Sequence, residues 1–175
     1  MSEDGLIIKE CIKNNRLAQK TLFDKYSRAM YTTAYRILND HDHAHDIVQE
    51  SFIEIFRDLK NIRNKNSLYS WMKTIVARKA IRLIKNAKQF ELIEENHNIK
   101  EAEFNQEFTA EDLDKAIRSL PAGNRTIFLL IEVEGYKHKE VAKILDISDG
   151  TSKSQLFYAK KLLRKYLKEM YGYER

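Results

Sequence analysis

Apolar residues recur every three or four positions along most of this chain, and that spacing places them on one face of an α-helix. In the first half of the chain, the pattern predicts four helices, over residues 6–12, 17–38, 43–59 and about 67–86. Polar breaks around Asn14, around Asn39 and over residues 60–66 separate these segments. A single proline and only five glycines suit long helices, because both residue types weaken a helix interior. We therefore expect an all-α protein.

The second half of the chain predicts shorter helices and a helix-turn-helix motif. Apolar spacing indicates helices over residues 110–120 and 124–134; Pro121 should stop the first, and Gly135 should end the second as a left-handed cap. Residues 135–167 then contain two more helical patterns, and the corner between them holds only Asp146-Ile147-Ser148. Ser148 or Asp149 can accept hydrogen bonds from the N–H groups that open the second of these helices. The exposed side of that helix is expected to carry polar, amide and cationic groups suited to phosphates and base edges in a major groove: Thr151, Lys153, Ser154, Gln155 and Tyr158.

Charged residues divide the chain into two basic stretches with an acidic stretch between them. Residues 57–88 hold ten Lys or Arg and one acid, and residues 136–168 hold nine Lys or Arg and three acids. Residues 87–112 hold eight acids and two lysines instead. We interpret this as two small helical domains, residues 1–88 and 109–175, joined by an acidic linker over residues 89–108. The sign of the charge on the two domains favours a polyanionic partner.

The predicted helix that ends near residue 86 gathers like charges on one stripe, because Arg78, Arg82 and Lys85 follow one another at i, i+4 and i+7. Such pairs destabilise a helix by about 0.2–0.5 kcal/mol each, and a bound anion would relieve that cost. A solvated helix face explains a charge run equally well. Both interpretations stay open from these residues alone.

Several classes of function are disfavoured by what the sequence lacks. Cys11 has no partner for an internal disulfide and is expected to be a buried small hydrophobe, which suits a reducing compartment. No apolar run approaches the roughly 18 residues that span a bilayer and no signal-like leader opens the chain, so we expect a soluble cytoplasmic protein. His41, His43 and His45 alternate with acids in diverging directions, so no metal site is expected. No phosphate-binding glycine loop or nucleophile motif is present, so we expect neither an enzyme nor a cofactor.

Three stretches of the chain carry a resemblance to a known family: HAHDIVQESFIEIF at 43–56, SWMKTIVARKAIRLIKN at 70–86 and LPAGNRTIFLLIEVEGYKHKEVAKILDISDGTSKSQLFYAKKLL at 120–163. With the order of the helices, they make the chain resemble an extracytoplasmic-function sigma factor, the smallest type of bacterial RNA polymerase sigma subunit. Such a subunit keeps the second and fourth conserved sigma regions and a linker between them. The resemblance implies a promoter-specificity subunit that has no catalysis of its own and binds the clamp coiled coil and the flap of core RNA polymerase. It also implies an anti-sigma partner, often membrane-anchored, and no small-molecule substrate.

The resemblance also implies roles for individual residues. Core polymerase would be bound by four residues of the third predicted helix: Asp46, Gln49, Glu50 and Phe52. The non-template strand of the minus-ten element would be bound by the loop after that helix and by the basic helix: Asn61, Arg63, Asn64, Lys65, Asn66, Ser67, Arg78, Lys79, Arg82 and Lys85. The upstream, minus-thirty-five element would be bound around the helix-turn-helix: Lys137, Thr151, Lys153, Ser154, Gln155, Tyr158 and Lys161. Trp71 lies on the apolar face of its helix, so we expect a core residue rather than a platform for an unstacked base.

Two departures from the family pattern bear on those roles. Lys79 and Arg82 stand where the family usually has Asn and Asp, and the added charge does not oppose binding of a DNA strand. After Gly150-Thr151, the family usually continues Val-Lys-Ser-Arg, whereas this chain continues Ser152-Lys153-Ser154-Gln155. Because an amide suits adenine better than guanine, we expect Gln155 to shift the base preference at the upstream element.

Two other functions are compatible with the same residues. The first is a stand-alone helix-turn-helix regulator whose N-terminal helices sense a signal or dimerise, and the second is a protein–protein adaptor with incidental basic faces. A complex with core polymerase that starts new transcripts separates the sigma factor from the regulator. Salt-dependent affinity for DNA separates both from the adaptor.

Overall fold

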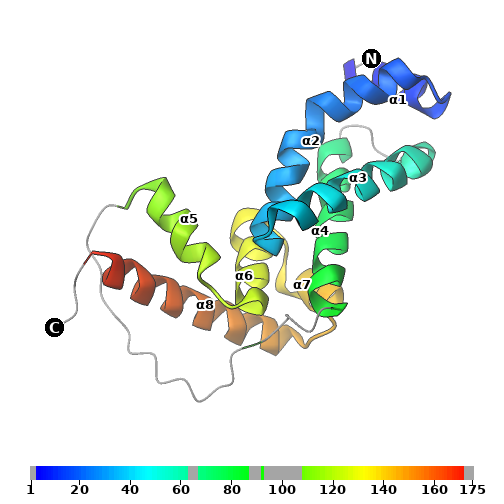
Figure 1. The fold of residues 1–175 in the computed structure, drawn as a ribbon. Helices are drawn as coiled ribbons and strands as arrows, with labels where there is room; N and C mark the ends of the chain where they lie inside the picture. The colour runs from blue at the N-terminus through cyan, green and yellow to red at the C-terminus, as the bar shows by residue number, and fades with distance from the viewer. Residues whose placement is uncertain (1–2, 63–66, 87–91, 93–107, 172–175) are drawn as a thin grey trace. The chain divides into compact units, whose positions relative to one another are not determined.

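The computed structural model describes residues 3–62, 67–86, 92 and 108–171. Figure 1 shows the helices in chain order. Their bounds are α1 Glu3–Ile12, α2 Arg16–Leu38, α3 His41–Asp58, the 3-10 turn η1 Leu59–Asn61, α4 Leu68–Asn86, α5 Ala110–Arg118, α6 Ala122–Phe128, the π-helical turn η3 Leu129–Val133, α7 His138–Leu145 and α8 Asp149–Met170. All regular structure within these ranges is helical, which confirms the all-α prediction.

Contacts between residues divide the chain into two compact units, 1–83 and 84–175, so the division falls in the last turn of α4. The domains and linker expected from the sequence, 1–88, 89–108 and 109–175, stay predictions. Most of the expected linker, residues 89–91 and 93–107, lies outside the described residues. No described helix is long and apolar enough to cross a membrane.

In the first unit, polar residues start and stop α2 and α3 where the sequence breaks were expected. The side chain of Asn15 caps α2 by accepting from the N–H groups of Leu17 and Ala18, and Asn39 ends α2 in the left-handed conformation, with φ 54°. Asp40 then caps α3 by accepting from the N–H of His43 at 2.9 Å. Because of this cap, α3 begins at His41, two residues before the predicted start.

The core of the first unit is built from apolar faces of α1 to α4. Its largest fully buried side chains include Ile8, Leu22, Met30, Ile55 and Met72. Cys11 is buried as expected, and burial raises the pKa of its thiol. Trp71 is only partly buried.

A polar contact fastens α1 to α2 beside that core. Asp4 accepts from Lys25 Nζ at 2.7 Å and from the Tyr26 hydroxyl at 2.8 Å. The hydrogen bond from Lys25, helped by that from Tyr26, lowers the pKa of the Asp4 carboxyl below its usual range. The first helix is therefore held by both apolar and charged contacts.

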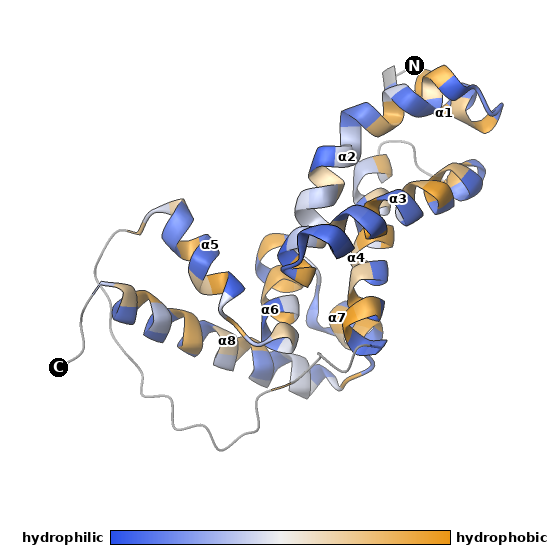
Figure 2. Ribbon diagram, in the orientation of Figure 1, coloured by the Kyte–Doolittle hydropathy of each residue, from blue (hydrophilic) through white to orange (hydrophobic). Residues whose placement is uncertain are grey.

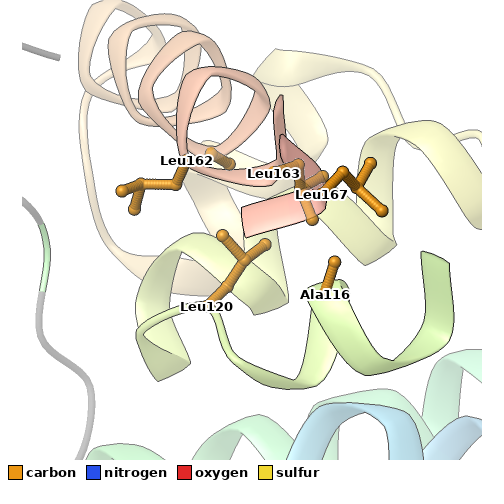
Figure 3. Close-up of a cluster of buried hydrophobic side chains, with 6 residues drawn as sticks. Ala116, Leu120, Leu162, Leu163 and Leu167 are labelled. Atoms are coloured by element: carbon orange, nitrogen blue, oxygen red, sulfur yellow. The ribbon is translucent and has the colours of Figure 1, made fainter. Parts of the chain in front are cut away.

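In the second unit, α5 packs on α8 through small and branched apolar side chains. Figure 3 shows Ala116 and Leu120 pointing towards Leu162, Leu163 and Leu167 of α8. Hydrophobic and hydrophilic residues alternate at short intervals along both helices in Figure 2, as amphipathic helices require. A capping box between Thr109 and Asp112 starts α5.

The turn after α5 is held by a buried arginine. Arg125 of α6 is 7% exposed, and its Nη1 donates to the carbonyl oxygens of Arg118 at 3.2 Å and Leu120 at 3.1 Å. Burial lowers the pKa of this guanidinium. The contact gives hydrogen-bond partners to carbonyls that the end of a helix leaves unpaired. It therefore links α6 to the turn that follows α5.

The helix predicted over residues 124–134 is realised as α6 followed by the π-helical turn η3. Gly135, with φ 75°, ends it in the left-handed conformation, as predicted. The corner between α7 and α8 is also as predicted. Asp146 adopts φ 58°, and the Ser148 side chain accepts from the N–H of Thr151 at 2.9 Å to cap α8.

Candidate nucleic-acid and protein interfaces

The N-terminal half of α8 presents a cationic and aromatic stripe to solvent. The Lys153 side chain is 61% exposed, and its Nζ contacts Asp149 at 2.7 Å. The hydrogen bond from Lys153 lowers the pKa of the Asp149 carboxyl. An exposed pair of this kind contributes little to stability, so Lys153 can exchange the carboxylate for a phosphate at small cost.

Phe157 lies one turn after Lys153 and was missed by the sequence reasoning. Phe157 is 49% exposed, which is unusual for a phenylalanine. Lys161 Nζ lies 4.6 Å from the centre of the Phe157 ring. The ring of Tyr158 meets it edge-on at 5.9 Å. Its spacing at i+4 from Lys153 was a signal that could have found it, because such residues share a helix face.

The remaining predicted upstream-element residues, apart from Gln155, are at least partly accessible. Lys137 is exposed just before α7, while Thr151, Ser154, Tyr158 and Lys161 are partly exposed. The hydroxyls of Thr151 and Ser148 lie 2.8 Å apart, and Ser154 donates to the carbonyl of Thr151 at 3.1 Å. These short polar residues thus support the start of α8 while staying near its surface.

Gln155 does not lie on the exposed side of α8, so that prediction is wrong. The residue is 4% exposed and points into the second unit. Asn124 of α6, itself fully buried, donates from Nδ2 to Gln155 Oε1 at 2.8 Å and to the Gln155 carbonyl at 3.1 Å. A side chain buried and bonded in this way is not available to a base edge, so we remove Gln155 from the DNA-contacting set.

In the first unit, α3 presents an acidic face in which Asp46, Gln49 and Glu50 are exposed, as predicted. The fourth residue predicted there, Phe52, is 2% exposed. Its ring packs against Phe23 at 4.7 Å and Phe56 at 5.8 Å. The prediction that Phe52 belongs to a docking surface is therefore wrong, because the side chain is part of the core.

The apolar residue that α3 does expose is Ile53. It is 70% exposed and follows Gln49 by four residues and Glu50 by three. The helical period alone could have found it, since Ile53 falls on the face that already carries the polar residues. We define the α3 docking face as Asp46, Gln49, Glu50 and Ile53.

The basic residues of α4 do not all have the same surroundings. Arg78, Arg82 and Lys85 are exposed. Lys79 instead has a side chain only 26% exposed, and its Nζ lies 3.1 Å from Glu54 and 3.7 Å from Glu50 of α3. Lys79 is therefore placed against the acid-bearing side of α3, and we remove it from the residues expected to bind a DNA strand.

Only part of the loop expected to bind the minus-ten strand can be placed. Asn61 is exposed and Ser67 is partly buried, whereas Arg63, Asn64, Lys65 and Asn66 lie outside the described residues. Near the start of α4, Tyr69 is 42% exposed, with Lys73 Nζ 5.2 Å from the centre of its ring. This aromatic residue, which the sequence reasoning missed, is more accessible than a core side chain.

Two of the three histidines at the start of α3 contact tyrosines of α2, and the third contacts an aspartate. His41 stacks on Tyr35 at 4.3 Å and is hydrogen-bonded to the Tyr31 hydroxyl, while His45 meets the Tyr31 ring at 4.5 Å. His43 Nδ1 lies 3.2 Å from Asp40. Over the described ranges, no group of three or more His, Cys, Asp or Glu is arranged to hold a metal ion.

Two family models match this chain in the order of its two units. The model described as "Sigma-70 region 2" matches residues 22–90, and the model described as "Sigma-70, region 4" matches residues 110–163. This chain belongs to the extracytoplasmic-function group of the sigma-70 family. The sigma factor is thus a promoter-specificity subunit of RNA polymerase, and the stand-alone regulator is not favoured.

Named relatives agree with that assignment along most of their length. The chain is 26% identical to the RNA polymerase sigma-H factor of Pseudomonas aeruginosa, over 96% of this chain and 95% of that protein. It is 28% identical to the sigma factor SigV of Bacillus subtilis, over 82% of this chain and 87% of that protein. The sigma factor therefore spans nearly the whole of these relatives.

Solved structures share the fold. The sigma factor RpoE of Bartonella quintana, in a co-crystal with the anti-sigma factor NepR, has a TM-score of 0.50 and 24% identity, with 89% of this chain and 98% of that chain covered. CnrH, in complex with the cytosolic domain of CnrY, has a TM-score of 0.54 and 15% identity, with 96% and 99% covered. At these identities the likeness concerns the fold alone.

Proposed function

We propose that this sigma factor divides its work among three surfaces: the α3 docking face binds core polymerase, α4 with its preceding loop holds the melted minus-ten strand, and α8 reads the upstream element. What supports the division most directly is the different chemistry of the exposed residues. Acids and an isoleucine cover α3, arginines and Lys85 cover one side of α4, and lysines flank an exposed phenylalanine on α8. Each surface suits the partner assigned to it.

The α3 docking face fits a basic protein surface. Asp46 and Glu50 would meet cations of the partner, and Ile53 would lose its water-exposed area on contact. Charge complementarity of this kind sets orientation and encounter rate, while burial of apolar area contributes affinity. The proposed partner region is the clamp coiled coil, with the flap as a second contact for the other unit.

The α4 and α8 surfaces fit nucleic acid in two different forms. Arg78, Arg82 and Lys85 can neutralise phosphates of an unpaired strand, and Tyr69, nearer the start of the same helix, offers an exposed ring for base stacking. On α8, Lys153 and Lys161 suit phosphates or guanine, and Phe157 suits a thymine methyl group. Neither surface brings together groups for a chemical step, and we propose that the protein has no catalytic activity and acts in the cytoplasm with the polymerase.

Reconstitution with core RNA polymerase tests this division. Wild-type protein should form a complex and start transcripts at new sites on genomic templates. Reversing Asp46 and Glu50 to Lys should abolish complex formation, whereas Lys153→Ala with Phe157→Ala should leave the complex intact and reduce use of the upstream element. Equal losses for both pairs in both assays would show that the surfaces are misassigned. Absence of any complex with wild-type protein would remove the proposal.

We also propose that an anti-sigma protein restrains this chain, because one solved neighbour, RpoE of Bartonella quintana, was crystallised with the anti-sigma factor NepR. An anti-sigma protein that covers the docking face should compete with core polymerase. Adding a candidate anti-sigma domain to the reconstituted system should therefore remove both the complex and the new transcripts. A candidate that binds the sigma factor and leaves transcription unchanged is not its regulator.

A further inference from the structure

Two polar contacts, one buried and one partly buried, tie the first half of α8 to the helices behind it. Asn124 of α6 donates to the side chain and to the carbonyl of Gln155, at 2.8 and 3.1 Å. His138, the first residue of α7, shares a hydrogen bond of 2.9 Å with the hydroxyl of Ser152. Asn124 and Ser152 are fully buried and Gln155 is 4% exposed. We call these two contacts the α8 clamps.

The α8 clamps restrict the rotation of α8 about its axis, which the apolar core of this unit does not. Apolar burial is not directional, so leucines such as Leu163 hold α8 in place but tolerate small rotations about its axis. A hydrogen bond weakens steeply once its angle or distance departs from the narrow normal range. Contacts at Ser152 and Gln155, three residues apart on the inward side, therefore define the rotation of the helix.

The first clamp is retained at an energetic cost. Asn124 Oδ1 is buried and accepts no hydrogen bond from the described residues, and an unsatisfied buried polar atom is destabilising. An apolar pair at these two positions would avoid that cost. The polar pair is therefore better explained by the orientation that it imposes than by stability.

The residues that face solvent lie next to the clamped ones. Lys153 and Ser154 lie between Ser152 and Gln155 in sequence, and Phe157 follows Gln155 by two residues. With side chains about 5–6 Å from the helix axis, a rotation of about 20° moves them by about 2 Å. That displacement is enough to break a hydrogen bond to a base edge, which requires about 2.7–3.2 Å between heavy atoms.

We propose that Asn124, Gln155, His138 and Ser152 are positioning residues that set the rotation of α8 for reading the upstream element. Ser152 and Gln155 are two of the positions at which this chain departs from the family pattern. The departures thus alter how the recognition helix is held, and Gln155 acts on specificity through its neighbours rather than by touching a base. The inference rests on the proposed role of α8 at the upstream element.

The test compares holoenzymes made with core polymerase and full-length variants: Asn124→Ala, Gln155→Ala and the double variant. A promoter fragment is first selected by transcription from genomic templates, and affinity is then measured for it and for versions with each upstream base pair substituted. We expect each single variant to bind the selected promoter about tenfold more weakly, which corresponds to the loss of one base contact, and to discriminate less against substitutions at the same upstream base pairs. The double variant should be no weaker than Asn124→Ala alone, because Asn124→Ala already removes both hydrogen bonds, whereas Gln155→Ala removes only the one to its side chain.

A matched control separates positioning from stability. Leu167 is 6% exposed and lies near the other end of α8, so Leu167→Ala destabilises the same unit without removing a clamp. At a temperature where circular dichroism shows every variant folded, Leu167→Ala should bind the promoter like wild type. A tenfold loss in this control would overturn the proposal. If Asn124→Ala does not fold, Ser152→Ala and His138→Ala test the second clamp in the same way.

Other outcomes are equally decisive. If Gln155→Ala alters preference at a single base pair and Asn124→Ala does not, Gln155 reads DNA directly and the positioning role is wrong. Wild-type affinity in all clamp variants would overturn it too. If the wild-type holoenzyme itself ignores substitutions in the upstream element, the proposed role of α8 fails first, and this result is distinct because it precedes any variant.

Discussion

Phe52 and Ile53 are neighbours in α3, and replacing each by alanine should have opposite consequences. Phe52 is 2% exposed, and loss of a buried phenylalanine costs about 3–5 kcal/mol. That is a large share of the roughly 5–15 kcal/mol that holds a typical domain folded. We expect Phe52→Ala to lower the thermal midpoint strongly, and to weaken polymerase binding only where the first unit has unfolded.

Ile53→Ala should spare stability and weaken docking. Its loss removes three carbons, worth about 0.8 kcal/mol each when they leave water. Because Ile53 is 70% exposed, about 1.7 kcal/mol of that burial is still available to a partner, which corresponds to roughly a 15- to 20-fold change in Kd. Stability should change by less than about 0.5 kcal/mol, as for an ordinary surface substitution.

Two measurements check the contrast: thermal unfolding followed by circular dichroism, and titration of N-terminally labelled protein with core polymerase followed by fluorescence anisotropy. Leu17, 73% exposed at the start of α2, is the matched control, because Leu17→Ala removes a similar apolar surface away from the α3 docking face. An Ile53→Ala variant that binds polymerase within twofold of wild type would refute the assignment of Ile53. A Phe52→Ala variant as stable as wild type would refute the burial argument.

Three further predictions concern elements that position the surfaces. Gly135→Ala should lower the free energy of unfolding, measured by chemical denaturation, by about 1–2 kcal/mol, because a φ of 75° is strained for any residue with a Cβ. The added Cβ itself would meet no atom within 4 Å. An unchanged denaturation midpoint would show that the turn relaxes. Thr109→Ala should cost about 0.5–2 kcal/mol by removing the cap of α5, and Thr109→Ser should restore most of it; equal loss in both variants would argue against the capping box. Asp4→Asn should matter only when Asp4 is ionised: its pKa is lowered in the folded protein, so its stabilisation is present above about pH 3.8 and is lost as the pH falls through the folded value. The thermal midpoints of wild type and Asp4→Asn should therefore converge as the pH falls through the folded pKa of Asp4, and they should differ most above about pH 3.8. A difference that stays constant over this pH range would contradict the assigned role of the Asp4 carboxylate.

Local patterns in the sequence were sufficient for most of the secondary structure. The predicted breaks at Asn39, Pro121 and Asp146 separate helices in the structure, and Ser148 and Gly135 form the predicted caps. These features depend on the chemistry of one or two residues and their neighbours in the chain. The start of α3 differs from expectation because Asp40 caps it, and residues 129–133 form a π-helical turn that the pattern did not predict.

Local patterns were less reliable for deciding which functional side chains reach solvent. The helix pattern placed Gln155 on the exposed side of its helix, and the family resemblance assigned Phe52 to docking, yet both are buried. Neither Ile53 nor Phe157 was predicted to be exposed, since an isolated apolar residue in an amphipathic helix is ordinarily assigned to the core. A shift of one residue along a helix turns the side chain by about 100°, so small errors in the inward direction exchange a core residue for a surface one.

The sequence by itself indicated an all-α protein and the approximate ends of most of its helices, because capping and periodicity are local properties of the chain. Its motifs also carried the resemblance to the two regions of a sigma factor. Only the tertiary structure decided which side chains contact one another and which are exposed. It placed Lys79 beside Glu54, brought Asn124 to Gln155 across 31 positions, and left Phe157 exposed beneath Lys161. Those relations depend on how helices distant in sequence pack together, and no local pattern specifies that packing.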